Sequence, residues 1–134
     1  MSYKVINVPE GSKVPAPPPK TWSNIKIHKN GHFYVAGMVA DGSSTYEQAR
    51  QIFTDIQDLI KAAGGVMNDI ISMQIFVIDL DENHDIWRAR QEFFSGDFPC
   101  STLIQVSRVG NPKAQPPTRI EINCCGYLGG SESN

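Results

Sequence analysis

The chain has 134 residues, a formal net charge of −2 and a pI near 5.9. This length suffices for one hydrophobic core and leaves little room for a second, so we expect one domain over residues 1–134. The near-neutral charge argues against nucleic acid or an anionic membrane as the main partner. No apolar run approaches the roughly 20 residues that a membrane-spanning helix needs, and we expect no leader peptide.

The cysteines and histidines favour a reducing compartment. Cys100, Cys124 and Cys125 are three in number, so they cannot all pair, and adjacent cysteines form a poor intrachain bridge. We therefore expect a cytoplasmic location. The three histidines have no ligand spacing with one another or with a cysteine, and we expect neither a metal site nor a cofactor.

The N-terminal part predicts a strand, an extended segment and a hairpin. Residues 3–8 alternate polar and apolar side chains, as a short strand does. Residues 9–20 hold five of the nine prolines and are expected to run over the surface, because proline lacks the donor that a central strand needs. Residues 24–28 and 32–36 read as the arms of a hairpin, since the Asn-Gly pair between them tolerates positive φ.

Two residues beside this hairpin are open to more than one interpretation. Gly37 ends the second arm, where the absent side chain either admits a ligand or neighbouring backbone or simply marks a bulge. Trp22 precedes the first arm and is either a core or lid residue or a ligand contact.

A helix is expected from Ser44 to about Gly64. Ser44 and Glu47 have the spacing of a capping box, and the Gly-Gly pair at 64–65 supplies the C-terminal cap. Apolar residues recur at intervals of three and four over about four turns, which predicts a single stripe facing the core. The stripe consists of Ala49, Ile52, Phe53, Ile56, Leu59, Ile60 and Ala63.

A strand and a second helix follow. Residues 70–80 are mostly apolar and are expected to be buried on both faces, or nearly so. After a turn at 81–83 a helix places Ile86 and Ala89 on its inner side and ends near Ser95.

The last two strands carry the residues of greatest chemical interest. In residues 118–123, Arg119 and Glu121 point to one face and the isoleucines between them point to the other. In residues 100–108, Ser101 and the alternate residues after it share a face and could line the same pocket as Glu121. The alternative is a solvated sheet face with a cross-strand ion pair.

The element order β-β-β-α-β-α-β-β predicts an α+β fold in which both helices cover one face of a mixed sheet. The second face of that sheet is amphipathic and needs cover. The small, polar tail at 129–134 is expected to be disordered.

Several motifs resemble the Rid/YjgF family of reactive-intermediate (enamine/imine) deaminases. They include the Pro-x-x-Thr strand start at Pro99, the Arg-Val turn at Arg108 and the Ile-Glu-Ile strand around Glu121, in the family's order from about Val5 to Tyr127. The resemblance implies a chorismate-mutase-like, six-stranded sheet with two helices on one face. It also implies a homotrimer whose sheets form a central barrel-like core, with small-molecule clefts between subunits.

The resemblance also assigns roles within the cleft. Glu121 matches the family's water-orienting glutamate, and backbone N–H groups from Cys100 to Thr102 are candidate oxyanion donors. Trp22 falls where the family has an aromatic pocket residue. Trp87 falls near a position that several members use to face the cleft, although core packing is the alternative.

One departure from the family's pattern concerns the substrate carboxylate. Ser101 stands where members that hydrolyse imines of small amino acids have an arginine, and a hydroxyl cannot form the bidentate, charge-assisted pair. Ser101 then binds a neutral or bulkier substrate, leaves room for one without an α-carboxylate, or marks lost catalysis. Arg119 could replace the missing cation, or it forms only a surface salt bridge.

These residues support three hypotheses of function. The first is a Rid-like enzyme that adds water to an enamine, imine or related intermediate, other than the usual 2-aminoacrylate deaminase. The second is a non-catalytic, metabolite-binding or chaperone-like trimer. The third is an interaction protein with the translation-inhibitor role once attached to this family, which the charge balance does not support.

Overall fold

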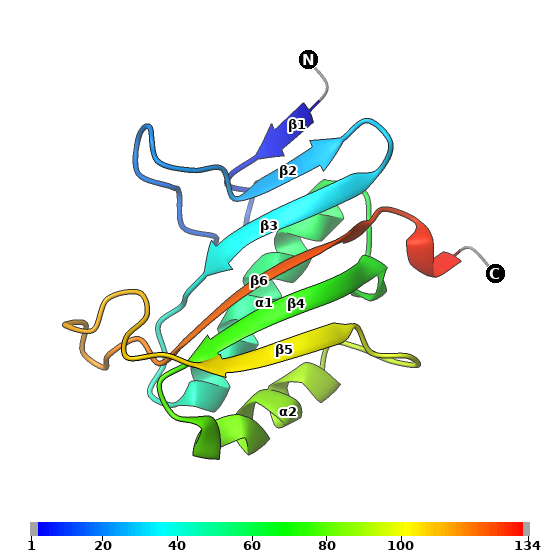
Figure 1. The fold of residues 1–134 in the computed structure, drawn as a ribbon. Helices are drawn as coiled ribbons and strands as arrows, with labels where there is room; N and C mark the ends of the chain where they lie inside the picture. Colours follow the sequence, from blue (N-terminus) through cyan, green and yellow to red (C-terminus); the bar gives the residue numbers. More distant parts are fainter. Residues whose placement is uncertain (1–2, 133–134) are drawn as a thin grey trace.

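The computed structural model describes residues 3–132, and its strands form one six-stranded sheet in the order β1-β2-β3-β6-β4-β5. Neighbouring strands are antiparallel except for the parallel pair β4 and β5. The strands and helices are β1 Tyr3–Ile6, β2 Ile25–His28, β3 His32–Met38, α1 Thr45–Ala62, β4 Ile70–Val77, α2 Asn83–Gln91, β5 Cys100–Gln105 and β6 Ile120–Tyr127. The predicted α+β order and mixed sheet are confirmed, with α1 passing behind the sheet and α2 lying beside β5 (Figure 1).

Helix α1 contributes six fully buried apolar side chains to the core, as its apolar stripe predicts. Ser44 is the N-cap and accepts a hydrogen bond from the Glu47 amide at 3.1 Å. The second half of the capping box differs from expectation, because the Glu47 carboxylate accepts from the Ser43 amide instead of the Ser44 amide. The stripe residues that are fully buried against the sheet are Ala49, Ile52, Phe53, Ile56, Leu59 and Ile60.

The hairpin and the proline-rich segment also follow the sequence. Gly31 has a φ of +103° in the turn between β2 and β3, a conformation that glycine tolerates without strain. The proline-rich segment packs over the end of β2 through Asn24, which is only 2% exposed. Its side-chain amide donates to the carbonyls of Asn7 at 2.7 Å and Pro15 at 2.9 Å, and these bonds hold the segment in place.

Strand β4 is buried on one face only in this chain, so the expectation of burial on both faces is wrong. Met73, Ile75 and Val77 are buried toward the helices. The other face carries Gln74, and Ile71 is 53% exposed at an irregularity in the pairing with β6. The sequence of a mostly apolar strand with a few polar residues does not show whether the second face of the strand is covered or open.

The C-terminal segment forms an ordered turn where disorder was expected. Residues Gly130–Glu132 make a short 3-10 helix. The buried Asp69 carboxylate accepts from the amides of Gly129 and Ser131, each at 3.1 Å, and from the Ser131 hydroxyl at 2.8 Å. These charge-assisted bonds fix the chain up to this point, and the rest of the tail lies outside the described residues.

Candidate active site

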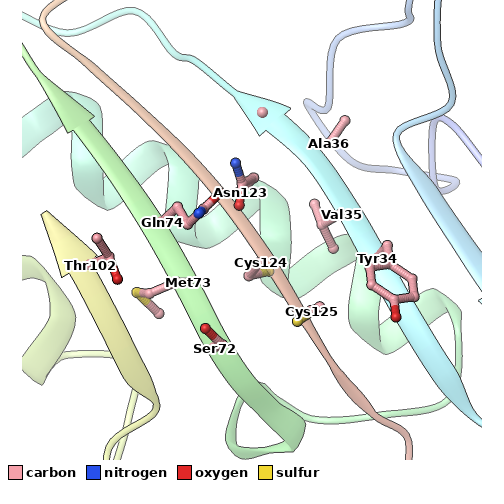
Figure 2. A pocket seen from close by; sticks show the side chains of 11 residues that line it. Tyr34, Val35, Ala36, Ser72, Met73, Gln74, Thr102, Asn123, Cys124 and Cys125 are labelled. Atoms are coloured by element: carbon pink, nitrogen blue, oxygen red, sulfur yellow. The ribbon is translucent and has the colours of Figure 1, made fainter. Parts of the chain in front are cut away.

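The face of the sheet opposite the helices contains a hollow of about 490 Å³, hereafter the central hollow. Four strands line it, and the pairing register aligns Asn123 of β6 with Gln74 of β4, and Gln74 with Thr102 of β5. Figure 2 shows these side chains rising side by side from adjacent strands. The lining residues with polar side-chain groups are Tyr34, Ser72, Gln74, Thr102, Asn123 and Cys125.

Glu121 lies beside the central hollow and is held there by contact with Gly37. A Cβ atom added at Gly37 would come within 3.0 Å of the Glu121 carboxyl carbon, so the glutamate occupies the space that the missing side chain leaves. Both interpretations of Gly37 hold in part: the pairing of β3 with β6 is irregular between Val35 and Met38, as at a bulge, and the close approach is made by the Glu121 side chain instead of a ligand or backbone. Gly37 also lines the central hollow, which brings the carboxyl to its edge.

The Glu121 carboxyl has no hydrogen-bond or ion-pair partner among residues 3–132, although the side chain is half-buried. Burial raises the pKa of Glu121 above its ordinary value, because desolvation penalises the charged form and no cation compensates. A raised pKa brings a carboxylic acid closer to the neutral range in which it can both take up and release protons.

A second hollow of about 300 Å³, hereafter the acid hollow, contains Glu121 and the start of the loop that links β5 to β6. Arg108 brings a guanidinium to it, and Phe76 of β4 brings an aromatic ring. The full lining is Phe76, Val106, Arg108, Val109, Gly110 and Glu121. The loop between β5 and β6 thus borders the candidate site. Figure 1 shows this loop extending beyond the ends of the two strands.

Arg119 does not lie next to Glu121, and the expectation that it shares that face is wrong. Its guanidinium forms an ion pair with Glu82 and donates to the Thr45 hydroxyl at 3.1 Å. These partners stand at the start of the helices, so the side chain turns to the helix-covered side of the sheet. Arg119 precedes the first residue of β6, where strand alternation no longer fixes the direction of a long side chain.

Ser101 also faces away from the central hollow. The parallel register pairs it with Met73, which is buried toward the helices, whereas Thr102 pairs with Gln74 on the open face. Cys100 pairs with Ser72 and is exposed on that open face. Of the three candidates at the start of β5, the structure therefore brings Thr102 into the hollow and leaves Ser101 outside it.

The two tryptophans lie apart from both hollows. Trp22 is 53% exposed, and its indole N–H donates to the Asn24 side chain at 3.2 Å. Trp87 is 45% exposed on α2 and packs edge-on against His84. Neither tryptophan is a core residue, and in this chain neither lines the space beside Glu121.

The remaining chemistry-bearing groups do not form a centre of their own. No group of three or more histidine, cysteine or acidic side chains within residues 3–132 is arranged to hold a metal ion. Cys124 points into the core, where burial raises its pKa and keeps the thiol protonated. No helix in the described part of the chain is long and apolar enough to cross a membrane.

Sequence reasoning missed the polar residues of β4 and the cation at the loop. Ser72 and Gln74 are two residues apart inside an apolar run, and that spacing was the available signal for a polar patch on one face. Arg108 gave no such signal, because its position beside Glu121 depends on the path of the loop.

The structure thus combines an α+β sheet that has helices on one face with an acid, Glu121, that lies on the other face without a partner among residues 3–132. A family model described as Endoribonuclease L-PSP matches residues 14–127, and the chain therefore belongs to this family, which is the Rid/YjgF family. The resemblance noted from the motifs is confirmed.

Individual relatives agree with this assignment. The fission-yeast (Schizosaccharomyces pombe) protein named "Protein mmf1, mitochondrial" is 28% identical over 123 residues, which cover 84% of this chain and 75% of that protein. A protein of unknown function from Pseudomonas aeruginosa is 26% identical, with a TM-score of 0.78 and 94% of each chain covered. RidA from an Antarctic Psychrobacter is 22% identical with a TM-score of 0.73, covers 84% of this chain and 92% of its own, and shows a common fold.

Proposed function

We propose that this protein adds water to a small enamine or imine and releases ammonia, with Glu121 as the group that moves the proton. The observation that carries the proposal is the Glu121 carboxyl itself: it is half-buried, without a partner among residues 3–132, and seated against Gly37 at the edge of a hollow. A carboxylate in a purely structural role is normally paired or hydrogen-bonded.

The reaction needs little machinery beyond this group. An enamine tautomerises to an imine, whose carbon is electrophilic. The Glu121 carboxylate takes a proton from water as the oxygen bonds to that carbon, and the carboxylic acid then returns the proton to the nitrogen. Collapse of the resulting carbinolamine breaks the C–N bond, forms the carbonyl and releases ammonia. Burial raises the pKa of Glu121, which makes its carboxylate a stronger base for the first step.

The open face of the sheet supports the further proposal of a homotrimer. Tyr34 is 64% exposed and Ile104 is 39% exposed on this face, so it presents two large apolar side chains to solvent. A partner subunit would cover these residues and close the hollows into clefts. The single-domain organisation and the cytoplasmic compartment stay predictions.

Replacing Glu121 with glutamine tests the proposed reaction. Imines generated in situ by an amino-acid oxidase from a panel of amino acids are supplied to the protein, and release of the 2-oxo acid is compared with spontaneous hydrolysis. Glu121→Gln keeps the shape of the side chain but cannot take a proton, and we expect its rate to fall by roughly 10²–10⁴-fold.

Glu92→Gln is the matched control, because Glu92 forms an exposed ion pair with Arg50 on the helix layer. Its rate should equal that of the wild type. A Glu121→Gln protein that retains the wild-type rate would exclude the mechanism. No acceleration of any imine, together with measurable binding of 2-oxo acids, would instead favour a non-catalytic metabolite-binding protein.

A further inference from the structure

A buried side-chain amide on α1 joins three segments of the chain near the candidate site. Gln48 is only 1% exposed. Its amide nitrogen donates to the carbonyls of Gly42 at 3.0 Å and Pro117 at 2.9 Å. Its amide oxygen accepts from the backbone N–H of Arg119 at 2.8 Å. Both N–H donors and the acceptor are thus used, and the reversed amide would set donor against donor, so the orientation of this side chain is fixed.

The three segments are those that leave β3 and enter β6. Gly42 follows the last residue of β3, whereas Pro117 and Arg119 precede the first residue of β6. Figure 1 shows the segment after β3, the end of the β5–β6 loop and the start of α1 together at one end of the sheet. Gln48 therefore bridges the ends of the two strands.

This bridge lies where the pairing of β3 with β6 stops. The pairing is irregular between Val35 and Met38, and its last pair is Met38 with Ile122. The residues that follow β3 form no further pair with β6. Beyond the last pair, the hydrogen bonds of Gln48 take the place of those that a continued strand would make.

Glu121 depends on the backbone at this end of β6 for its position. On the β4 side, the Ile78 N–H donates to the Arg119 carbonyl at 3.1 Å. On the β3 side, the amide of Gln48 holds Arg119, which is two residues before Glu121. The Glu121 carboxyl has no hydrogen-bond partner among residues 3–132 and rests against Gly37 of β3. The spacing of β3 and β6 thus decides where the carboxyl lies.

We propose that Gln48 is a positioning residue for Glu121: by joining the end of β3 to the start of β6, it keeps the carboxyl against Gly37 at the edge of the central hollow. The effect on turnover rests on the function proposed above, whereas the positioning rests on the three hydrogen bonds of Gln48. The alternative is a side chain that only stabilises the fold. That alternative predicts a lower stability with the Glu121 carboxyl unmoved.

Titration of the Glu121 carboxyl by carbon-detected NMR on the full chain tests the positioning without any assay of activity. Burial raises the pKa of Glu121 in the wild type. Gln48→Met keeps the length of the side chain without its hydrogen bonds. We expect the pKa of Glu121 in this variant to shift toward the ordinary range of a glutamate, because a displaced carboxyl gains solvent. Arg108, the other charged group that lines the acid hollow, is the same in every variant.

Gln51→Met is the matched control, because Gln51 lies on the same helix and donates to the Asp55 carboxylate instead of to a strand end. Its Glu121 titration should match that of the wild type. Gln48→Asn is a second variant in case Gln48→Met does not fold. It keeps an uncharged amide that is one methylene too short to retain all three hydrogen bonds, and the pKa of Glu121 should shift in the same direction. An unchanged pKa of Glu121 in the folded Gln48 variants overturns the proposal.

The imine assay, expressed per folded protein, shows whether the positioning matters for turnover. A displacement of about 1 Å at a reacting group lowers a rate by roughly 10²-fold, so kcat should fall by about this factor in Gln48→Met while KM changes little. In the Glu121→Gln background, Gln48→Met should cause no further loss, since both changes act through one carboxyl.

The two measurements separate this inference from the proposed reaction. A shifted pKa of Glu121 in Gln48→Met, in a protein that hydrolyses no imine, would support the positioning role and overturn the hydrolase. Turnover that depends on Glu121, with an unchanged pKa of Glu121 in Gln48→Met, would leave the hydrolase standing and overturn the positioning role.

Discussion

Substitution of Gly37 by alanine should disable the proposed site while leaving the fold intact. An alanine Cβ at this position would lie 3.0 Å from the Glu121 carboxyl carbon and 3.3 Å from its Cγ, with one carboxyl oxygen closer still. No other atom is among the three nearest. The glutamate must therefore move, and because only the far end of a flexible side chain is involved, it can do so by changing rotamer.

Two opposing effects of Gly37→Ala on the free energy of unfolding nearly cancel. Alanine stabilises a strand by roughly 0.5–1 kcal/mol relative to glycine, because it lowers the conformational entropy of the unfolded chain. Displacing the Glu121 side chain from its rotamer destabilises the fold by roughly 0.5–1.5 kcal/mol. The net change in the free energy of unfolding should thus stay within about 1 kcal/mol. A displacement of about 1 Å at a reacting group lowers a rate by roughly 10²-fold, so activity and stability should separate clearly.

Thermal unfolding and imine hydrolysis, measured on the same preparations, check this expectation. Gly130→Ala is the control, because the nearest atom to its added Cβ lies at an ordinary 3.7 Å. The double variant Gly37→Ala/Glu121→Gln should be no slower than Glu121→Gln alone, since both changes remove the same function. Full activity in Gly37→Ala would refute the argument that this contact positions the carboxyl.

Two further predictions concern stability. Gly126→Ala should destabilise the fold by about 1–3 kcal/mol or more in thermal unfolding, because its Cβ would lie 2.7 Å from the Phe33 ring and press on the backbone of Asp69. A wild-type midpoint would contradict this. Asp69→Asn should cost about 2–3 kcal/mol: burial raises the pKa of Asp69, but its hydrogen bonds outweigh burial and lower it from 3.8. Since the folded-state pKa is depressed, this stabilisation is present above pH 3.8 and is lost as the pH falls through the lower value, so an undiminished difference between Asp69→Asn and the wild type in acid would contradict the assignment.

The fold was predictable because local signals agree with one another along most of the chain. The helix stripe beginning at Ala49 and the Asn-Gly turn at Gly31 each specify one structure, and both are observed. Strand β4 is the exception. Its run of apolar residues indicates a strand but does not show whether a second layer covers the face opposite the helices. In the single chain Ile71 is exposed.

The acid of the candidate site was predictable and its surroundings were not. Glu121 lies within a strand whose alternation fixes the face on which it stands. Ser101 also lies within a strand, but polar and small residues occupy both faces of β5, so only the pairing with β4 decides that Thr102 enters the hollow instead. The alternation of side chains along a strand assigns its residues to two faces, but it does not tell which of the two faces lines the hollow.

The contrast between Arg119 and Arg108 shows where such reasoning stops. Arg119 is two residues before Glu121, and strand alternation therefore predicts that both side chains lie on one face. The Arg119 guanidinium instead pairs with Glu82, a residue distant in sequence that immediately precedes α2. Arg108 stands thirteen residues before the acid, and the loop returns it to the same hollow. A charged side chain is available to a ligand only when no other group in the fold pairs with it. Whether such a pair forms depends on the tertiary structure and cannot be read from the sequence. Arg108 therefore stays exposed at the acid hollow, without a partner among residues 3–132.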